Sequence, residues 1–542
     1  MTSFAVNAQK IGTAMKLTGI ILAAVLVSSF LLYSSLPLGV PDEWVWPRQA
    51  FPEDLGEWLD RFLLPILFSG AALAFCRFAD GRISRSGWMM KSGLVFALVI
   101  VAFCWQRMAI HAASSPHREL RLLWVLYDKY ASGYFFSATF HPEKTAEILR
   151  GYEAKMAEGD VLHEGTHPPG LLLLNRSALA VTDAWPGLEI VQQCAVSPAA
   201  IRLFRELERD VGLARPLTRS ELTSLCLVSL VTSMFCATAV IPVFLLVARI
   251  GSFQTAWRAA CLSFTAPGIT MFLPRSDVLY VASGAWLLLL IVLAVSERSP
   301  MKQMIWSTLG AMVLALCLFV SLAHLPVLLA GGLFGLMAWW KPSDSVGSIT
   351  RGRLLTVAGV AAVSFFAVVL VFNRYTDCNL WKVWGLNLRN HENFYSSSVR
   401  TWWKWALVNP FEFGMATGLP VAAVACLHLI NIAIIWPGDK PQLRWTPVDL
   451  LSLSFAVTWA CLWLSGKNMG EAARLWCFMT PWAAMIASAG LGSRESCGSQ
   501  LISQSAVGFR GESSHGVWLT LLASQFTVCL LTTGFVSGYL EM

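Results

Sequence analysis

The sequence predicts an all-α membrane protein, a polytopic bundle whose helices cross the bilayer roughly 11 to 14 times. Of its 542 residues, 56% are hydrophobic and only 13% are charged. That charged fraction is about half of what a soluble domain carries, and the mean hydropathy is +0.58. So few charges could not cover a water-soluble protein of this size. The composition therefore excludes a soluble enzyme, a disordered regulator and a nucleic-acid-binding module.

Apolar runs give the expected spans, because a helix that crosses the hydrocarbon core needs about 20 apolar residues. They lie near 17–38, 63–77, 92–111, 223–248, 259–274, 277–296, 305–324, 325–340, 354–372, 413–436, 449–465, 475–491 and 517–538. A shorter apolar run from Leu171 to Val181 follows Pro169. We expect one membrane domain, 1–542, with a helical extracytoplasmic loop at 112–168.

Charges between the spans predict the orientation of the chain. Segment 39–62 carries six acids and two arginines, whereas 77–91 carries four cations and one acid. The positive-inside rule places 77–91 and 249–258 in the cytoplasm. The N-terminus is then cytoplasmic, and 39–62 and 112–168 lie outside. The charges of 185–221 are balanced and leave its side open.

The polar segment 112–168 holds the densest group of chemistry-bearing side chains. Asp128 stands among tyrosines, and the segment leads into His-Glu-Gly-Thr-His-Pro-Pro-Gly at 163–170. Two prolines suit the entry of an extended segment into a helix, although the same residues also read as simple turn punctuation. His163 and His167 have the i, i+4 spacing of helical zinc ligands. The glycine and prolines disfavour a helix there, so we expect no zinc site.

Here the residues resemble a known family. His167-Pro168-Pro169-Gly170 resembles the Lys/His-Pro-Pro-Leu/Gly motif that precedes a helix in the GT-C superfamily of integral-membrane glycosyltransferases. These enzymes use polyprenyl-phosphate sugars and include protein O-mannosyltransferases and the aminoarabinose transferase of lipid A. Segment 248–277, which ends in Phe-Leu-Pro-Arg-Ser-Asp, is similar to the family's cytoplasmic turn, helix and external Asp. Segment 470–476 resembles its Gly-Glu-x-x-Arg-Ile/Leu-Trp motif, and the similarity covers roughly 92–490.

The resemblance implies a glycosyltransferase that moves a hexose or pentose from a polyprenyl-phosphate donor to an acceptor hydroxyl on the extracytoplasmic side, with inversion. It implies a multi-pass protein of the bacterial inner membrane, acting in the cell envelope. The implied partners are membrane lipid, the donor, and a glycan, lipid or protein acceptor, with no nucleic acid. The sugar and acceptor stay undetermined, and a divalent metal stays open as a cofactor.

The resemblance also implies a general base. Many members carry an Asp-Glu pair after the first span, which Asp42 and Glu43 match. Two further spans separate that pair from His167, whereas Asp128 lies in the same loop, 39 residues earlier (167 minus 128). We therefore expect Asp128 to be the base, with Asp42 and Glu43 as alternatives. A solvated loop acid is the plainer interpretation of Asp128.

Cations should neutralise the leaving phosphate, because stabilising charge that develops in the transition state lowers the barrier. Arg275 and Arg474 are the candidates, and His167 is a weaker one. By resemblance, Asp277 orients a cation or a metal, and Glu471 supports Arg474. Plainer interpretations exist: Asp277 could pair with Arg275 at a helix end, and Glu471 with Arg474 at i, i+3 on a helix surface.

A different class of function fits the same composition. A lipid-linked-sugar flippase or secondary transporter would also have many spans, but it predicts broken helices and acids near mid-span. A structural subunit would not need convergent polar motifs. This sequence concentrates its polar residues in 112–168, 274–277 and 467–474, which favours the transferase.

Overall fold

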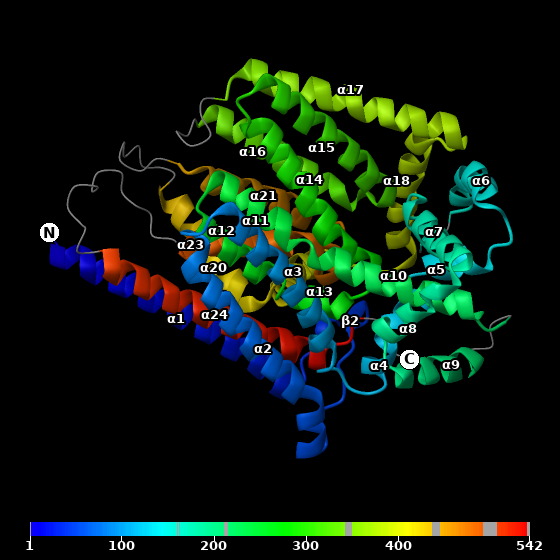
Figure 1. The fold of residues 1–542 in the computed structure, drawn as a ribbon, viewed down its shortest axis with the longest axis horizontal. Helices are drawn as coiled ribbons and strands as arrows, with labels where there is room; N and C mark the ends of the chain where they lie inside the picture. The colour runs from blue at the N-terminus through cyan, green and yellow to red at the C-terminus, as the bar shows by residue number, and fades with distance from the viewer. Residues whose placement is uncertain are drawn as a thin grey trace.

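The computed structural model describes residues 2–159, 161, 163–210, 215–341, 349–435, 445–491 and 507–538. Almost all of this part of the chain is helical, and its one sheet is a hairpin of β1 (Leu38–Val40) and antiparallel β2 (Trp44–Trp46). Figure 1 shows long helices packed side by side. The prediction of an all-α polytopic bundle is confirmed.

The long helices are α1 (Thr2–Tyr33), α2 (Leu55–Ile83), α3 (Trp88–Ile110), α10 (Arg219–Ala237) followed by α11 (Val240–Ile250), α14 (Leu279–Ser296), α15 (Pro300–Val320), α16 (Leu325–Trp340), α17 (Arg351–Thr376), α21 (Pro447–Leu464) and α24 (Val507–Phe535). The others are α4 (His117–Tyr127), α5 (Tyr134–Phe140), α6 (Thr145–Ala157), α7 (Gly170–Ala184), α8 (Ile190–Ala195), α9 (Pro198–Asp210), α12 (Phe253–Ser263), α13 (Pro267–Phe272), α18 (Leu380–Ser397), α19 (Trp402–Thr417), α20 (Leu419–Ile435), α22 (Ala472–Leu475) and α23 (Thr480–Leu491). Single 3-10 turns lie at Pro186–Glu189, Ser276–Val278, Leu322–His324 and Cys477–Met479.

Ten helical stretches in the described part of the chain are long and apolar enough to cross a membrane. The pair α19 and α20, bent by 113°, would be the eleventh. The bend falls at Gly418, whose φ is +92°. A side chain at this glycine would collide with Gln525 of α24, so both the backbone angle and the packing require glycine there. Ten spans are one fewer than the lower limit of the predicted range of 11 to 14, and eleven would equal that limit.

The predicted span 413–436 is therefore wrong as a single helix, since it is bent at Gly418. Two further predicted spans are not single long helices. Segment 259–274 forms α12 and α13, and Pro267 is the first residue of α13. A proline has no N–H with which to continue a helix ladder, so the chain breaks before it. Segment 475–491 contains the end of α22, a 3-10 turn and the short α23. Both predictions of an unbroken span are wrong, because a count of apolar residues does not register a break.

Segments predicted to lie on the same side of the membrane do meet at one end of the bundle. Segments 77–91 and 249–258 are joined there, because the ammonium of Lys91 lies 3.7 Å from the centroid of the Phe253 ring. The start of α1 lies at this end, and the end of α24, with α4 and α9, lies at the other (Figure 1). The assignment of this end to the cytoplasm stays a prediction from charge.

The opposite end carries segments 39–62 and 112–168. The guanidinium of Arg61 donates a hydrogen bond of 2.9 Å to the carbonyl of Ala112 and ties the two together. The segment 185–221, whose side the charges left open, lies here too, since α9 packs on α4 and α8 packs on the start of α10. The loop region 112–168 is helical, as predicted, with α4, α5 and α6.

Several spans begin or end at this second end of the bundle. Helix α14 starts just after Asp277, α15 ends at Val320, α16 starts at Leu325, and α21 ends at Leu464. Polar residues that flank these four helix ends are therefore brought together, although they come from distant parts of the sequence.

Candidate active site

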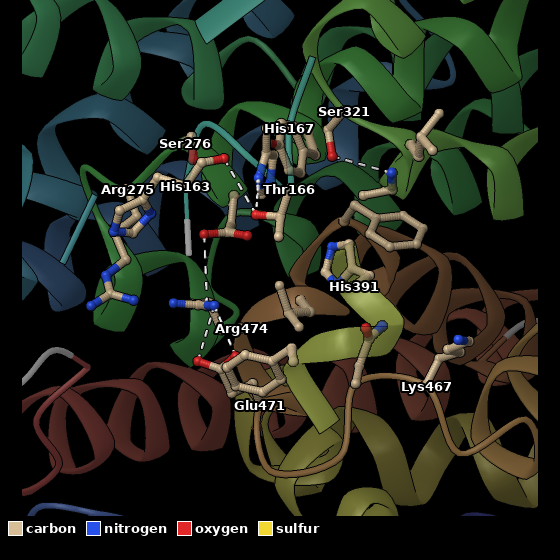
Figure 2. A pocket seen from close by; sticks show the side chains of 18 of the residues that line it. His163, Thr166, His167, Arg275, Ser276, Ser321, His391, Lys467, Glu471 and Arg474 are labelled. Carbon is tan, nitrogen blue, oxygen red and sulfur yellow. Dashed lines mark hydrogen bonds and ion pairs between the residues drawn. The ribbon is translucent and has the colours of Figure 1, made fainter. Parts of the chain in front are cut away.

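A cavity of about 1370 Å³ lies where these helix ends meet. Its walls come from the β1–β2 hairpin, the loops around 130–134 and 163–167, the start of α14 and α16, helix α18, and the segment between α21 and the 3-10 turn at Cys477–Met479. It contains all five residues predicted to bind substrate: His167, Arg275, Asp277, Glu471 and Arg474. Figure 2 shows four of them close together.

Arg474 is the centre of the charged group in the cavity. Its Nη2 lies 3.0 Å from the carboxylate of Glu471, and its Nε lies 3.9 Å from Oδ2 of Asp277. The second distance is too long for a hydrogen bond. Burial lowers the pKa of Arg474, but the charges of Glu471 and Asp277 outweigh burial and raise it. The Glu471–Arg474 pair therefore belongs to a cavity wall and not to a solvated helix surface.

Arg275 brings a second guanidinium into the cavity. Its side chain is only 6% exposed, and its Nε has no hydrogen-bond partner among the residues that the structure describes. Burial and the nearby Arg474 lower the pKa of Arg275 to about 10, while Asp277 and Glu471 act against them. Arg275 therefore remains a cation at neutral pH, and part of its hydrogen-bonding capacity is free for a ligand.

His167 lies deeper than a surface loop residue would. Its ring lies 5.6 Å from that of Tyr134 and 6.3 Å from that of His391, and its Nδ1 lies 3.2 Å from Oγ1 of Thr166. Burial, reinforced by the charges of His391, His163 and Arg474, lowers the pKa of His167 to about 3. The imidazole is therefore neutral at pH 7. His167 can donate or accept a hydrogen bond but supplies no positive charge for a phosphate.

The residues after His167 hold it in place. Helix α7 begins at Gly170, directly after the two prolines, as their lack of N–H groups suggested. A Cβ on Gly170 would lie 2.6 Å from the carbonyl oxygen of Phe319 at the end of α15. Glycine is needed at this position because the two backbones approach so closely.

Helix α18 fastens the loop that carries His167. The Asn390 amide donates to the carbonyls of Met156 and Gly165, at 2.9 and 2.7 Å. One turn earlier, Asn387 donates to the carbonyl of Thr166. These bonds give the buried carbonyls of the loop hydrogen-bond partners. They also hold α18, which lines the cavity, against the loop that carries His167.

Asp128 does not line the cavity. Its two carboxylate oxygens accept the backbone N–H groups of Tyr130 and Ala131, at 3.2 and 3.0 Å, as an Asp that closes a turn commonly does. Asp128 follows the last residue of α4. Its charge is still felt by Arg275, where it acts to raise the arginine's pKa. It lies near the cavity, behind the loop that forms part of the wall.

The two alternative bases belong to the hairpin turn. Asp42 is exposed, with a φ of +65°. The carboxylate of Glu43 is buried and accepts four hydrogen bonds: from the N–H and Oγ1 of Thr401 at 2.8 and 2.6 Å, from Lys404 at 2.9 Å and from the Trp405 indole at 2.8 Å. Neither acid lines the cavity.

Burial alone would raise the pKa of Glu43. The bonds from Thr401, Lys404 and Trp405 outweigh burial and lower it to about 2. A carboxylate so fully occupied by donors is a poor acceptor for a substrate proton. Its geometry fits an anchor that ties the hairpin to α19.

Sequence reasoning missed four side chains in the cavity wall: His391, Tyr395, Arg400 and Lys467. Three of them fall in 373–412, a segment rich in tryptophans and cations that contains none of the motifs from which the site was predicted. The signal that could have found them is the density of hydrogen-bonding groups on α18, since an interface anchor does not need two asparagines and a histidine on one helix.

Among the residues described, no group of three or more His, Cys, Asp or Glu side chains is arranged to hold a metal ion. The charged partner of Asp277 is Arg474 rather than a second acid. The described residues of this cavity therefore offer no such ligand set for the divalent metal that the resemblance left open.

No protein-family model matches the sequence, and no curated protein is detectably similar to it. Solved structures of an oligosaccharyltransferase from Archaeoglobus fulgidus are similar at low level. One, tethered to an acceptor peptide with the NVT sequon, is 11% identical with a TM-score of 0.37 and covers 97% of this chain and 56% of its own. One with dolichol-phosphate and an inhibitory peptide is 12% identical, with a TM-score of 0.34 and the same coverage.

A third structure, with Zn and sulfate, is 12% identical with a TM-score of 0.33, and it covers 62% of this chain and 44% of its own. The chain thus spans about half the length of the structures it matches. A likeness this weak carries no information about the site, so function must be argued from the cavity itself.

Proposed function

We propose that the protein is a membrane glycosyltransferase that moves a sugar from a polyprenyl-phosphate donor to an acceptor hydroxyl on the extracytoplasmic side. The observation that carries the proposal is the mixed character of the cavity. One side holds Arg275, Arg474 and two acids. The cavity also has an apolar part, which includes Leu325 and Leu329 of α16, whose side chains are 42% and 44% exposed. Such a site fits a ligand with an anionic head and a long hydrocarbon tail.

The cations fit the leaving group of this reaction. When the bond from sugar to phosphate breaks, negative charge grows on the phosphate oxygens, and fixed cations stabilise that change without reorganising. Arg275 and Arg474 both remain charged at neutral pH. The pKa of Arg275 is lowered only to about 10, and the pKa of Arg474 is raised above its ordinary value. A secondary transporter needs no such cluster at one end of its spans.

The acceptor hydroxyl must lose a proton as it attacks, which calls for a carboxylate in the cavity. We assign this role to Asp277, because it lines the cavity and, among the described residues, its carboxylate makes only the long 3.9 Å approach to Arg474. Glu471 also lines the cavity but is bonded to Arg474 at 3.0 Å. Asp128 is the second candidate, and its oxygens would have to leave their turn N–H groups to act.

Neutral polar and aromatic side chains complete the site. His167, Tyr130 and Tyr134 line the same cavity and offer hydrogen bonds and ring faces to a sugar. A neutral imidazole suits sugar hydroxyls, which both donate and accept. Direct attack by the acceptor on the anomeric carbon, with the phosphate leaving from the opposite side, inverts the configuration.

The sidedness follows from the charge distribution. The cation-rich segment 77–91 lies at the end of the bundle opposite the cavity, together with 249–258. If the positive-inside rule holds, that end is cytoplasmic and the cavity is extracytoplasmic. On the extracytoplasmic side we expect the sugar donor to be a lipid-linked sugar rather than a nucleotide sugar.

The test is transfer by the purified protein in lipid nanodiscs that contain a radiolabelled polyprenyl-phosphate sugar. Label appearing in an acceptor glycan, lipid or peptide supports the proposal, and Asp277→Asn should strongly reduce its transfer. A matched liposome assay follows the labelled lipid between leaflets. Movement across the bilayer with no transfer to any acceptor class would identify a flippase and reject the transferase.

A further inference from the structure

A second hollow lies at the end of the bundle that carries segment 77–91. Helices α2 and α24 pack against each other (Figure 1), and an open groove of about 560 Å³ runs between them. Helix α24 contributes His515 and Leu519, and α2 contributes the rest of the described wall. This groove shares no lining residue with the cavity around Arg474, and the proposed sugar transfer makes no use of it.

The wall from α2 is one continuous face of that helix. Gly70, Ala74, Phe78 and Arg82 line the groove at intervals of four residues, and residues at this spacing lie on the same side of a helix. From Gly70 to Arg82 the helix rises about 18 Å, at about 1.5 Å per residue. One leaflet contributes about 15 Å to a hydrocarbon core of about 30 Å. The groove is therefore about as long as one leaflet is deep.

The deeper part of the groove is apolar and open. Its described walls there are Leu73 and Ala74 of α2 and Leu519 of α24. A Cβ on Gly70 would meet no atom of the described residues within 4 Å, so this glycine leaves open space beside the helix. An acyl chain that lay along this part of the groove would gain van der Waals contacts with both helices.

The other end of the groove carries two arginines. Arg77 and Arg82 both line the groove, and both are exposed. The guanidinium of Arg82 lies 3.7 Å from the centroid of the Phe78 ring, and its Nη1 donates a hydrogen bond of 3.2 Å to the carbonyl of Phe78. These contacts hold the guanidinium against the groove wall and use only part of its set of N–H donors.

No acid balances these two arginines within the described part of the groove wall. Asp80, the nearest acid in the sequence, is buried, and its two carboxylate oxygens accept hydrogen bonds of 2.9 Å from Arg258. His515 contacts the same carboxylate through its Nδ1 at 3.0 Å. The arginine end of the groove is therefore positively charged, and guanidinium groups bind phosphate oxygens through strong, charge-assisted hydrogen bonds.

We propose that this groove binds one anionic phospholipid, with its phosphate at Arg77 and Arg82 and an acyl chain along α2 toward Gly70. The apolar part of the groove favours a lipid, because a free phosphate would use only the arginine end. Two guanidiniums without an acid favour a headgroup of net negative charge over a zwitterionic one, as in other basic pockets between membrane helices. The bound lipid bridges α2 and α24. This inference does not depend on the transferase proposal.

The test is native mass spectrometry of the full chain in detergent, titrated with phosphatidylglycerol and with phosphatidylcholine of the same acyl chains. One phosphatidylglycerol should bind more tightly than phosphatidylcholine. Arg77→Gln and Arg82→Gln should each weaken its binding by about 5-fold, and together by about 30-fold. Gly70→Leu fills the apolar part of the groove and should weaken binding with no change of charge. The matched control is Arg85→Gln, at an exposed arginine of the same segment that does not line the groove.

Three outcomes would overturn the site. An equal loss in Arg85→Gln would show that the general positive charge of 77–91 attracts the lipid, without a defined groove. Unchanged binding in Gly70→Leu would remove the acyl chain from the groove. Full displacement of the lipid by inorganic phosphate at low millimolar concentration would assign the arginines to a free anion. Because all the substituted residues are exposed, each variant should melt at the wild-type temperature without added lipid, and its sugar transfer should be unchanged.

Discussion

The carboxylate of Asp277 lies 3.9 Å from the Nε of Arg474, although the two residues are 197 positions apart in the sequence (474 minus 277). Asp277 stands in a 3-10 turn before α14, and Arg474 stands in the four-residue helix α22. This pairing joins two motifs that the sequence presents separately. It makes Asp277 the carboxylate best placed to take a proton from a substrate held against the arginines.

The first prediction concerns that proton. Asp277→Asn should reduce transfer by about 10²- to 10⁴-fold, the range that a general base contributes. The substitution is nearly isosteric, so the measurement is single-turnover transfer of labelled sugar by correctly folded protein. Asp128→Asn is the matched variant and should lose far less. A full loss at Asp128 with activity kept at Asp277 would exchange the two roles.

Glu43 gives a prediction about stability. Its pKa of about 2 in the folded protein is below the ordinary value of 4.5. A depressed carboxylate pKa adds stability that is fully present above about pH 4.5 and is lost as the pH falls toward 2. The melting temperature of the wild-type protein should therefore fall over this window more steeply than that of Glu43→Gln. Parallel curves would show that the four donors do not stabilise the charge.

The same variant tests whether Glu43 has a chemical role. An anchor that ties the hairpin to α19 affects activity through the position of the cavity wall. Glu43→Gln should therefore raise KM with a smaller change in kcat, measured with saturating and limiting donor. A collapse of kcat with KM unchanged would indicate that Glu43 takes part in the chemical step.

His167 predicts a dependence on pH in the same direction as that of Glu43, but over a higher pH window. Its pKa is about 3 in the folded protein, below the ordinary value of 6.5. Between these two pH values the imidazole is protonated in the unfolded chain and neutral in the folded protein. Stability is therefore lost as the pH falls from about 6.5 toward 3. His167→Gln should flatten the fall of the melting temperature between pH 7 and pH 5. An unchanged slope would mean that other groups, such as the nearby His391, dominate the effect.

At the far end of the bundle, Arg258 and Asp80 form a buried ion pair at 2.9 Å. Arg258→Ala removes the guanidinium from the buried carboxylate of Asp80, which keeps its contacts with Gln254 at 3.1 Å and His515 at 3.0 Å. The loss should cost up to roughly 3–5 kcal/mol. The double variant with Asp80→Asn should recover part of that loss. Thermal unfolding in detergent measures both, and transfer per folded molecule should be unchanged, since neither residue lines the cavity.

The sequence was informative about the fold because membrane helices must be apolar over their whole length. It was less informative where an apolar segment is divided into two short helices, as at Pro267. A hydropathy average over the segment does not show such a break. The substrate-binding candidates His167, Arg275 and Arg474 stood in recognisable motifs, and the helix ends bring all three to one cavity. Tyr395 could not be found in this way.

Tyr395 owes its place to a loop more than 70 residues away, and no local pattern encodes that contact. Asp128 illustrates the converse. Its sequence position beside the motif suggested catalysis, whereas its side chain is used by its own turn. Whether a carboxylate faces a cavity or its own backbone depends on a few side-chain torsions, which composition and spacing do not specify.

The apolar, half-exposed part of the cavity wall at Leu325 and Leu329 has a consequence for how a lipid-borne molecule arrives. A molecule in the surrounding leaflet can slide sideways against α16 with its tail still in hydrocarbon. It thereby avoids the roughly 0.8 kcal/mol that each methylene would cost if drawn into water. Occupancy is then governed by the density of the carrier in the plane of the membrane, and diluting it with other lipids should slow the protein even when the amount per volume of sample is held constant.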